Sequence, residues 1–176
     1  MYNINISSRI LHFLLPAGTS RGVYTTRKSY YVTLSDSNQP DVVGIGECAT
    51  LPDLSCDAIP DEEYERKLQA FCNDFCHTGV IDIAAMRPYP SMLFGLETAK
   101  AQLDAKGSIN LFNTTFGRGE EGITINGLVW MGTFEEMYQR LEAKLKAGFH
   151  CVKLKIGAID FEKELELIHH IRQAFT

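Results

Sequence analysis

The chain has 176 residues, 45% of them hydrophobic, which is enough apolar material for a folded core and excludes a disordered chain. Its formal net charge of −5, with scattered lysines and arginines, argues against a basic face that binds nucleic acid. The sequence has no apolar run long enough to cross a membrane and no signal-peptide pattern at its start. We therefore expect a cytoplasmic protein whose partners include neither nucleic acid nor a membrane.

Three strands are predicted near the N-terminus. Segments rich in β-formers cover residues 4–15, 29–34 and 42–48, and turn-forming residues separate them. An antiparallel meander is the simplest topology for such strands. Residues 18–27 are predicted to form a flexible loop, longer than a tight hairpin requires, and long loops on a rigid scaffold often contact ligands.

Two helices are expected to follow these strands. Pro60 and the acidic residues after it are typical of a helix start, and Gly79 is typical of the end. A second helix is predicted over residues 91–106 and ends at Gly107. The first helix carries apolar side chains at helical spacing: Tyr64, Leu68, Phe71, Cys72 and Phe75.

The second part of the chain has a different pattern. Residues 123–130 and 151–156 are predicted as strands, and each precedes a predicted helix. Thr133 and Glu136 form a capping-box signature at the start of the first of these helices. We expect the last helix to bury a stripe made of Phe161, Leu165, Ile168 and Phe175. Its acidic residues Glu162, Glu164 and Glu166 are expected on a solvated face.

The order of these elements predicts two domains. Strands followed by helices indicate an α+β domain over residues 1–115, and the β-α-β-α order over residues 116–176 is typical of a parallel sheet or barrel. Two βα units do not make a stable sheet, because parallel strands need covered faces and more neighbours. We therefore expect the second domain to be incomplete.

Lys153 and Lys155 are the residues most indicative of chemistry. Alternate residues of a strand share a face, so both ammonium groups point to one side and Val152, Leu154 and Ile156 to the other. Periodicity alone favours a strand with a solvated lysine face. In parallel barrels, however, catalytic residues lie at the C-terminal ends of strands, where Lys155 is expected. Two neighbouring ammonium groups each favour loss of a proton from the other, which suits a lysine that removes a proton from carbon.

Three stretches of the chain resemble a known family. They are G-I-G-E-C-A-T-L-P at 44–52, S-M-L-F-G-L-E-T-A at 91–99 and V-K-L-K-I-G at 152–157. In this order and spacing they resemble the N-terminal half of the enolase superfamily, muconate lactonizing subgroup, and most of all the o-succinylbenzoate synthases. The resemblance implies an α+β capping domain (an antiparallel meander plus helices), followed by the first two βα units of a truncated TIM-like (β/α)7β barrel.

The resemblance also implies roles for particular residues. Lys155 would be the acid/base that takes the α-proton, and Lys153 would tune it and help to hold the carboxylate or enolate end of the substrate. Arg21 would either contact an anionic substrate or be solvated. Two capping loops, at 19–26 and 51–55, would screen the site, with candidate residues Thr19, Ser20, Arg21, Leu51 and Pro52.

The implied cofactor is Mg²⁺, which would stabilise the enediolate electrostatically. In the family its acidic ligands and a second lysine belong to strands that would lie beyond residue 176, so no residue of the chain is nominated as a metal ligand. The 176-residue chain alone is therefore expected to be inactive.

Three functions remain open at this point. The first is a lyase that dehydrates a cyclohexadiene carboxylate to o-succinylbenzoate in menaquinone biosynthesis. The second is a racemase of N-acylamino acids or an epimerase of dipeptides, which would use the same lysine pair. The third is a non-catalytic α+β binding or interaction module, with Lys153 and Lys155 on a solvated strand. The enzyme readings imply a small-molecule carboxylate as partner, and an oligomer is possible.

Overall fold

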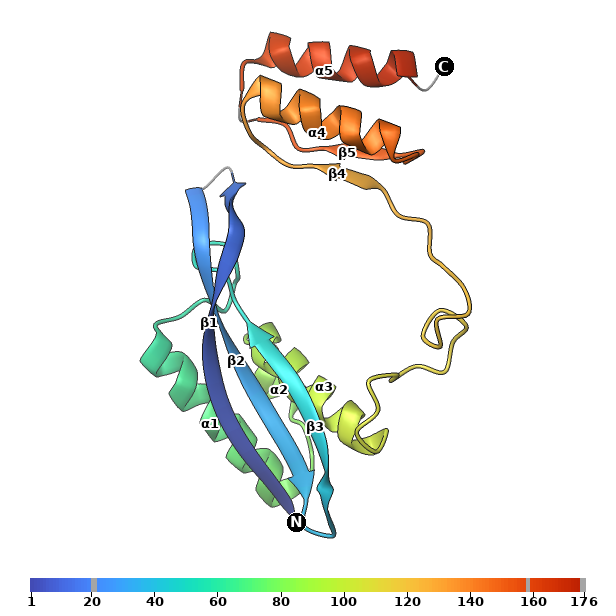
Figure 1. Cartoon of the computed structure of the whole chain (residues 1–176). Coiled ribbons are helices and arrows are strands. Elements are labelled where there is room, and N and C mark those ends of the chain that lie inside the picture. Colours follow the sequence, from blue (N-terminus) through green and yellow to red (C-terminus); the bar gives the residue numbers. More distant parts are fainter. Residues whose placement is uncertain (20–21, 158, 175–176) are drawn as a thin grey trace. The chain divides into compact units, whose positions relative to one another are not determined.

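The computed structural model describes residues 1–19, 22–157 and 159–174. The chain separates into two compact units, shown with the sequence colouring of Figure 1. The first unit comprises Met1–Phe13 and Thr26–Glu121, and the second comprises Leu14–Thr25 and Gly122–Thr176. The domain boundary expected between residues 115 and 116 stays a prediction. No described helix is both long and apolar enough to cross a membrane.

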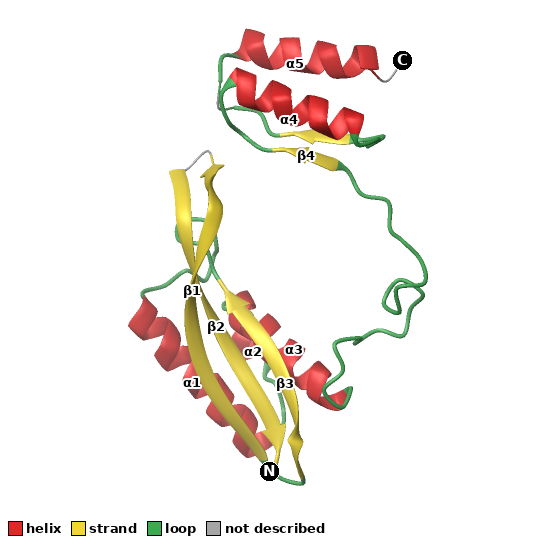
Figure 2. Cartoon of the chain, viewed as in Figure 1, coloured by secondary structure: helices red, strands yellow, loops and turns green. Residues whose placement is uncertain are grey.

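A three-stranded sheet begins the chain, with the strands in the order β1 (Tyr2–Thr19), β2 (Gly22–Asp36) and β3 (Gln39–Ala49) (Figure 2). β2 and β3 are antiparallel, with Tyr30 opposite Cys48. Because only two residues separate β1 from β2, these strands are antiparallel as well. The predicted antiparallel meander is confirmed.

The predicted loop at residues 18–27 is wrong. β1 continues to Thr19 and β2 begins at Gly22, so most of this segment lies in two long strands. The physical reason is visible in the sequence: residues 23–26 (Val-Tyr-Thr-Thr) are β-branched or aromatic, and such side chains favour extended backbone. Ser20 and Arg21 lie outside the described residues.

Three helices follow the sheet: α1 (Asp61–Thr78), α2 (Ile83–Met86) and α3 (Pro90–Asp104). The helices predicted at 61–78 and 91–106 are confirmed within one or two residues. α1 ends at Gly79, whose φ of 69° is the left-handed conformation that glycine adopts at helix ends. α2 has four residues, too short to produce a periodic signal. The core of this unit lies between the sheet and the helices, and α1 buries Tyr64, Leu68, Cys72 and Phe75 there.

The glycines of the 44–52 stretch bring α3 against the backbone of β3. A methyl group added to Gly46 would lie 1.7 Å from the carbonyl oxygen of Gly95, and one added to Gly44 would lie 1.9 Å from that of Ala99. A methyl group on Gly95 would in turn lie 2.2 Å from Cys48 Sγ. Glycine is thus required on both elements, because each backbone occupies the space of the other's side chains.

The buried thiols of this core are expected to resist modification. Burial raises the pKa of Cys48 to about 12 and that of Cys72 to about 12, so at pH 9 both stay protonated, the unreactive form. Cys56 and Cys151 are exposed. Treatment with iodoacetamide at pH 8.5 should modify the two exposed cysteines and spare the two buried ones until the chain is unfolded, as peptide mass spectrometry would show. Equal labelling of all four would contradict this core.

The second unit has the predicted order of two βα units: β4 (Gly127–Val129), α4 (Phe134–Lys146), β5 (Val152–Leu154) and α5 (Phe161–Ala174). β4 and β5 are parallel, with Gly127 opposite Val152 and Val129 opposite Leu154. Both strands are shorter than predicted. The capping box is confirmed: the Thr133 side chain accepts a hydrogen bond from the Glu136 backbone, and the Glu136 carboxylate accepts one from the Thr133 backbone.

The core of the second unit consists of Val129, Met137, Leu141 and Leu167, with Val152 and Leu154 packed against it. The stripe predicted for α5 is displaced: Leu167 is buried, whereas Phe161 is 64% exposed. Ile156 is also 53% exposed and does not join Val152 and Leu154 in this core. The helix has apolar residues on two adjoining faces, and packing against α4 selects the face of Leu167. Phe175 lies outside the described residues.

Candidate active site

Lys155 lies immediately after β5, and its backbone N–H donates to the Val129 carbonyl at 3.2 Å, which extends the pairing with β4. Its side chain is half-buried, whereas that of Lys153 is exposed. Val152 and Leu154 contact the helical core, so strand alternation directs both lysines to the opposite face of the sheet. The face on which the lysines were predicted therefore agrees with the packing of β5.

Trp130 is a site residue that the sequence reasoning missed. It directly follows β4, and the Lys155 Nζ lies 3.7 Å from the centroid of its ring. An ammonium group at this position is attracted to the negative face of the aromatic ring. One signal could have found it: Trp130 is the single tryptophan of the sequence and stands at the C-terminal end of a predicted strand.

The indole of Trp130 also contacts the end of the β1–β2 hairpin. Its Nε1–H donates to the Gly18 carbonyl at 2.7 Å, and both residues belong to the second compact unit. At the same hairpin end, the Thr19 hydroxyl donates to the Gly22 carbonyl at 3.0 Å. Of the residues predicted to cap the site here, the structure thus describes Thr19, while Ser20 and Arg21 lie outside the described residues.

Arg140 of α4 fixes the backbone that carries Trp130. Its Nη1 donates to the carbonyls of Trp130 at 3.1 Å and Met131 at 3.0 Å. Its Nη2 lies 3.9 Å from the carboxylate of Glu136, which also closes the capping box. The turn after β4 is therefore attached to the first turns of α4.

Glu164 corrects the expectation of a solvated acidic face on α5. It is only 5% exposed, and its carboxylate accepts a hydrogen bond from the backbone N–H of Gly157, two residues beyond Lys155. The chain that leaves β5 passes the first turns of α5, and the Glu164 carboxylate there satisfies one of its backbone donors. Glu162 and Glu166 are exposed, as predicted.

Removing this carboxylate should destabilise the second unit. We expect Glu164→Ala to lower its free energy of unfolding by about 2 kcal/mol, because the hydrogen bond between the Gly157 N–H and a buried charged group is lost. Glu164→Gln keeps an acceptor and should lose less. Urea unfolding followed by the fluorescence of Trp130 measures the effect. Glu162→Ala is the matched control on an exposed position, and an equal loss in that variant would contradict the role of Glu164.

Leu51 and Pro52 belong to the first unit, whereas the lysines belong to the second. The Leu51 N–H donates to the Ser55 hydroxyl at 2.9 Å, and the Leu51 carbonyl accepts from the Ser55 N–H at 3.0 Å, so this segment is a closed turn. Ser55 contributes to a cavity of about 630 Å³, which is also lined by Arg27, Glu47 and Asp57. The role of Leu51 and Pro52 in covering a substrate stays a prediction.

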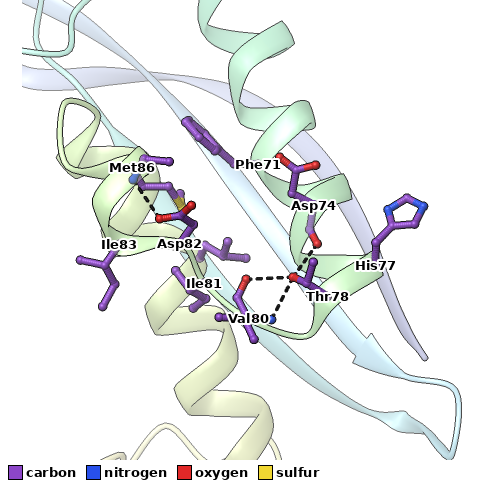
Figure 3. Close-up of a pocket in the computed structure, with 11 residues that line it drawn as sticks. Phe71, Asp74, His77, Thr78, Val80, Ile81, Asp82, Ile83 and Met86 are labelled. Atoms are coloured by element: carbon purple, nitrogen blue, oxygen red, sulfur yellow. Dashed lines mark hydrogen bonds between the residues drawn. The ribbon is translucent and has the colours of Figure 1, made fainter.

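A second cavity, of about 670 Å³, lies in the first unit between the end of α1, the segment after it and α2 (Figure 3). The Thr78 hydroxyl in this cavity donates to the Asp74 carbonyl at 2.8 Å and contacts the backbone of Val80 at 3.2 Å. These bonds close the end of α1. None of the predicted site residues lines this cavity, and we assign no chemistry to it.

Within residues 1–19, 22–157 and 159–174, no group of three or more histidine, cysteine, aspartate or glutamate side chains could hold a metal ion. The described acids therefore do not fit an Mg²⁺ site, and no catalytic step through a metal is derived from them.

Comparisons with known proteins place the chain among related sequences and structures. It is 35% identical to the o-succinylbenzoate synthase of Desulfotalea psychrophila over 197 aligned residues, a match that covers 94% of the chain and 52% of that relative. The crystal structure of MenC from Desulfotalea psychrophila LSv54 superposes with a TM-score of 0.65 and 29% identity, over 98% of the chain and 54% of that structure. No model of a known protein family matches the chain.

A dipeptide epimerase from Cytophaga hutchinsonii, solved with Mg and the dipeptide D-Ala-L-Val, superposes with a TM-score of 0.64 and 19% identity. This match covers 97% of the chain and 48% of that structure, and at this identity it shows the fold alone. The chain thus spans about half the length of each of these three relatives.

Proposed function

We propose that the chain belongs to the enolase superfamily, as its 35% identity to an o-succinylbenzoate synthase and its fold support. We further propose that the whole protein dehydrates a cyclohexadiene carboxylate to o-succinylbenzoate in menaquinone biosynthesis. The observation that carries the proposal is the position of Lys155. It is half-buried at the C-terminal end of a parallel strand, on the face turned away from α4 and α5. Catalytic residues of parallel barrels occupy such positions.

In the proposed reaction, Lys155 is the acid/base. Its neutral amine takes the proton from the carbon next to the substrate carboxylate, and the electron pair of the broken C–H bond moves toward that carboxylate. The Lys155 ammonium then gives that proton to the hydroxyl group on the neighbouring carbon, which leaves as water, and the ring becomes aromatic. Lys153 shares the face of Lys155, and we propose that its ammonium group attracts the substrate carboxylate.

We also propose that the whole protein uses Mg²⁺. The support is the Mg bound to a dipeptide epimerase of the same fold. We further propose that its ligands are none of the described acids, among which no group able to hold a metal ion is found. The cytoplasmic location and the small-molecule carboxylate partner likewise remain proposals.

The test is an assay of the protein expressed from its complete reading frame. We expect the cyclohexadiene carboxylate to be converted into aromatic o-succinylbenzoate, followed by ultraviolet absorbance, with activity lost on chelation and restored by Mg²⁺. The 176-residue chain, assayed in parallel, is expected to be inactive. A full-length protein that leaves this substrate unchanged would contradict the proposal.

A second candidate function is epimerisation of dipeptides or racemisation of N-acylamino acids, which the similarity to a dipeptide epimerase favours. Both reactions begin with removal of the same kind of α-proton, so Lys155 would serve in either. The same preparation should be incubated with dipeptides and N-acylamino acids in deuterium oxide, and the products separated by chiral chromatography. Activity on these substrates alone would favour the second function, and inactivity on every substrate would favour a non-catalytic module.

A further inference from the structure

We propose that Trp130 is a positioning residue that fixes the Lys155 side chain for proton transfer and couples it to the end of the β1–β2 hairpin. This inference rests on the acid/base role proposed for Lys155. Lysine carries its amine on a flexible four-carbon stem, so a lysine that acts on one carbon atom needs a neighbour that restricts the stem. Trp130 is placed to do so, because Lys155 Nζ lies 3.7 Å from the centroid of its ring.

Three separate segments hold the Trp130 side chain and backbone in place. At the hairpin end, the Gly18 carbonyl accepts a hydrogen bond from the Trp130 indole N–H at 2.7 Å. α4 binds its carbonyl through Arg140 Nη1 at 3.1 Å. The strand pairing anchors the backbone just before it, since the Lys155 N–H donates to the carbonyl of Val129, the residue before Trp130. The indole is therefore held at its N–H group, and the residue is held at its backbone carbonyl. The face of the ring stays accessible to the ammonium group of Lys155.

Through Trp130, the end of the β1–β2 hairpin affects how firmly the Lys155 side chain is held. When the Gly18 carbonyl is in place, the indole has its acceptor and the ring restrains Lys155. Without that acceptor the half-buried indole N–H would be unsatisfied, and the ring would be free to rotate away from the lysine.

Two substitutions separate the ring from its N–H group. Trp130→Phe keeps an aromatic face for Lys155 but cannot bind Gly18, and Trp130→Leu removes both contacts. In the full-length protein we expect kcat to fall about tenfold in the phenylalanine variant and about 100-fold in the leucine variant, the size of loss caused by a misplaced catalytic group. KM should change less than kcat. The kinetic isotope effect with α-deuterated substrate should rise in both variants, because proton transfer becomes slower than the other steps.

Tyr138→Phe is the matched control, since Tyr138 is an aromatic residue of α4 whose ring packs against Phe134 and His170 and not against Lys155. It should leave kcat and the isotope effect unchanged. A purely structural role for Trp130 would lower stability without changing the isotope effect. If the wild-type protein is active and both Trp130 variants keep its kcat, the inference is overturned while the proposed function stands.

If the wild-type protein is inactive on every substrate, the proposed function fails, and a spectroscopic measurement still tests the geometry. The indole N–H of Trp130, labelled with nitrogen-15, should exchange slowly with solvent because it is bonded to Gly18. Its resonance should move in Lys155→Met, which removes the ammonium group from the ring face. A resonance unchanged by Lys155→Met, or fast exchange of the indole N–H, would overturn the inference independently of activity.

Discussion

Lys155→Arg is expected to lower the kcat of the full-length protein by about 10³-fold, within the range that general acid–base catalysis contributes. Arginine keeps the positive charge and can stay on the face of Trp130, but its guanidinium group remains protonated at any working pH and cannot accept a proton from carbon. The loss would therefore identify proton abstraction, and not charge, as the role of residue 155. Exchange of the substrate α-proton with deuterium oxide, followed by NMR, is the direct measurement.

The control for this prediction is Lys146→Ala, an exposed lysine in the last turn of α4 of the same unit. It should retain the wild-type rate. Lys153→Arg should retain more activity than Lys155→Arg, since an attractive charge is all that the proposal asks of residue 153. If Lys155→Arg keeps near wild-type exchange of the α-proton, Lys155 is not the base.

Gly46→Ala is expected to destabilise the first unit by about 3 kcal/mol, the upper end of the usual cost of overpacking. The added methyl group would lie 1.7 Å from the Gly95 carbonyl oxygen, so the backbones of β3 and α3 must separate. The atoms that the methyl group would meet belong to the backbone of α3 and not to the end of a flexible side chain. A small local movement therefore cannot relieve the clash. Since about 1.4 kcal/mol corresponds to tenfold in an equilibrium constant, the buried thiol of Cys48 should become about 100-fold more reactive as this interface opens more often.

The labelling rate of Cys48 under native conditions, followed by peptide mass spectrometry, tests this prediction directly. Gly122→Ala is the control, because no atom lies within 4 Å of the position of its added methyl group and its φ is not in the left-handed region. That variant should stay within about 0.5 kcal/mol of the wild type, as surface substitutions usually do. Unchanged labelling of Cys48 in Gly46→Ala would contradict the close contact of β3 and α3.

Much of the candidate site could be predicted from local patterns. The alternation of Lys153 and Lys155 with Val152 and Leu154 indicated which side chains share a face, and the contacts of β5 agree with it. The capping box of Thr133 and Glu136 fixed the start of α4. These predictions succeeded because each depends on residues within a few positions of one another, whose geometry the backbone repeat determines.

Other parts of the site depend on residues distant in the sequence. The indole of Trp130 binds the carbonyl of Gly18, 112 residues away, and no local pattern indicates that pair. The sequence around Glu164 looks like that of an exposed helical acid such as Glu162. In the structure, however, Glu164 is buried and accepts a hydrogen bond from the backbone of Gly157. The apolar stripe predicted for α5 was displaced for the same reason, since packing against α4 selected Leu167.

The sequence by itself determined the order of strands and helices apart from α2, the ends of α1 at Pro60 and Gly79, and the shared face of the two lysines. Only the tertiary structure decided the contact of the β1–β2 hairpin with Trp130, the burial of Glu164 and the contact of Trp130 with Lys155. The physical reason is the range of the interactions. Helix ends and strand faces follow from backbone geometry over a few residues, whereas burial and side-chain contacts are fixed by which surfaces pack together once the chain has folded.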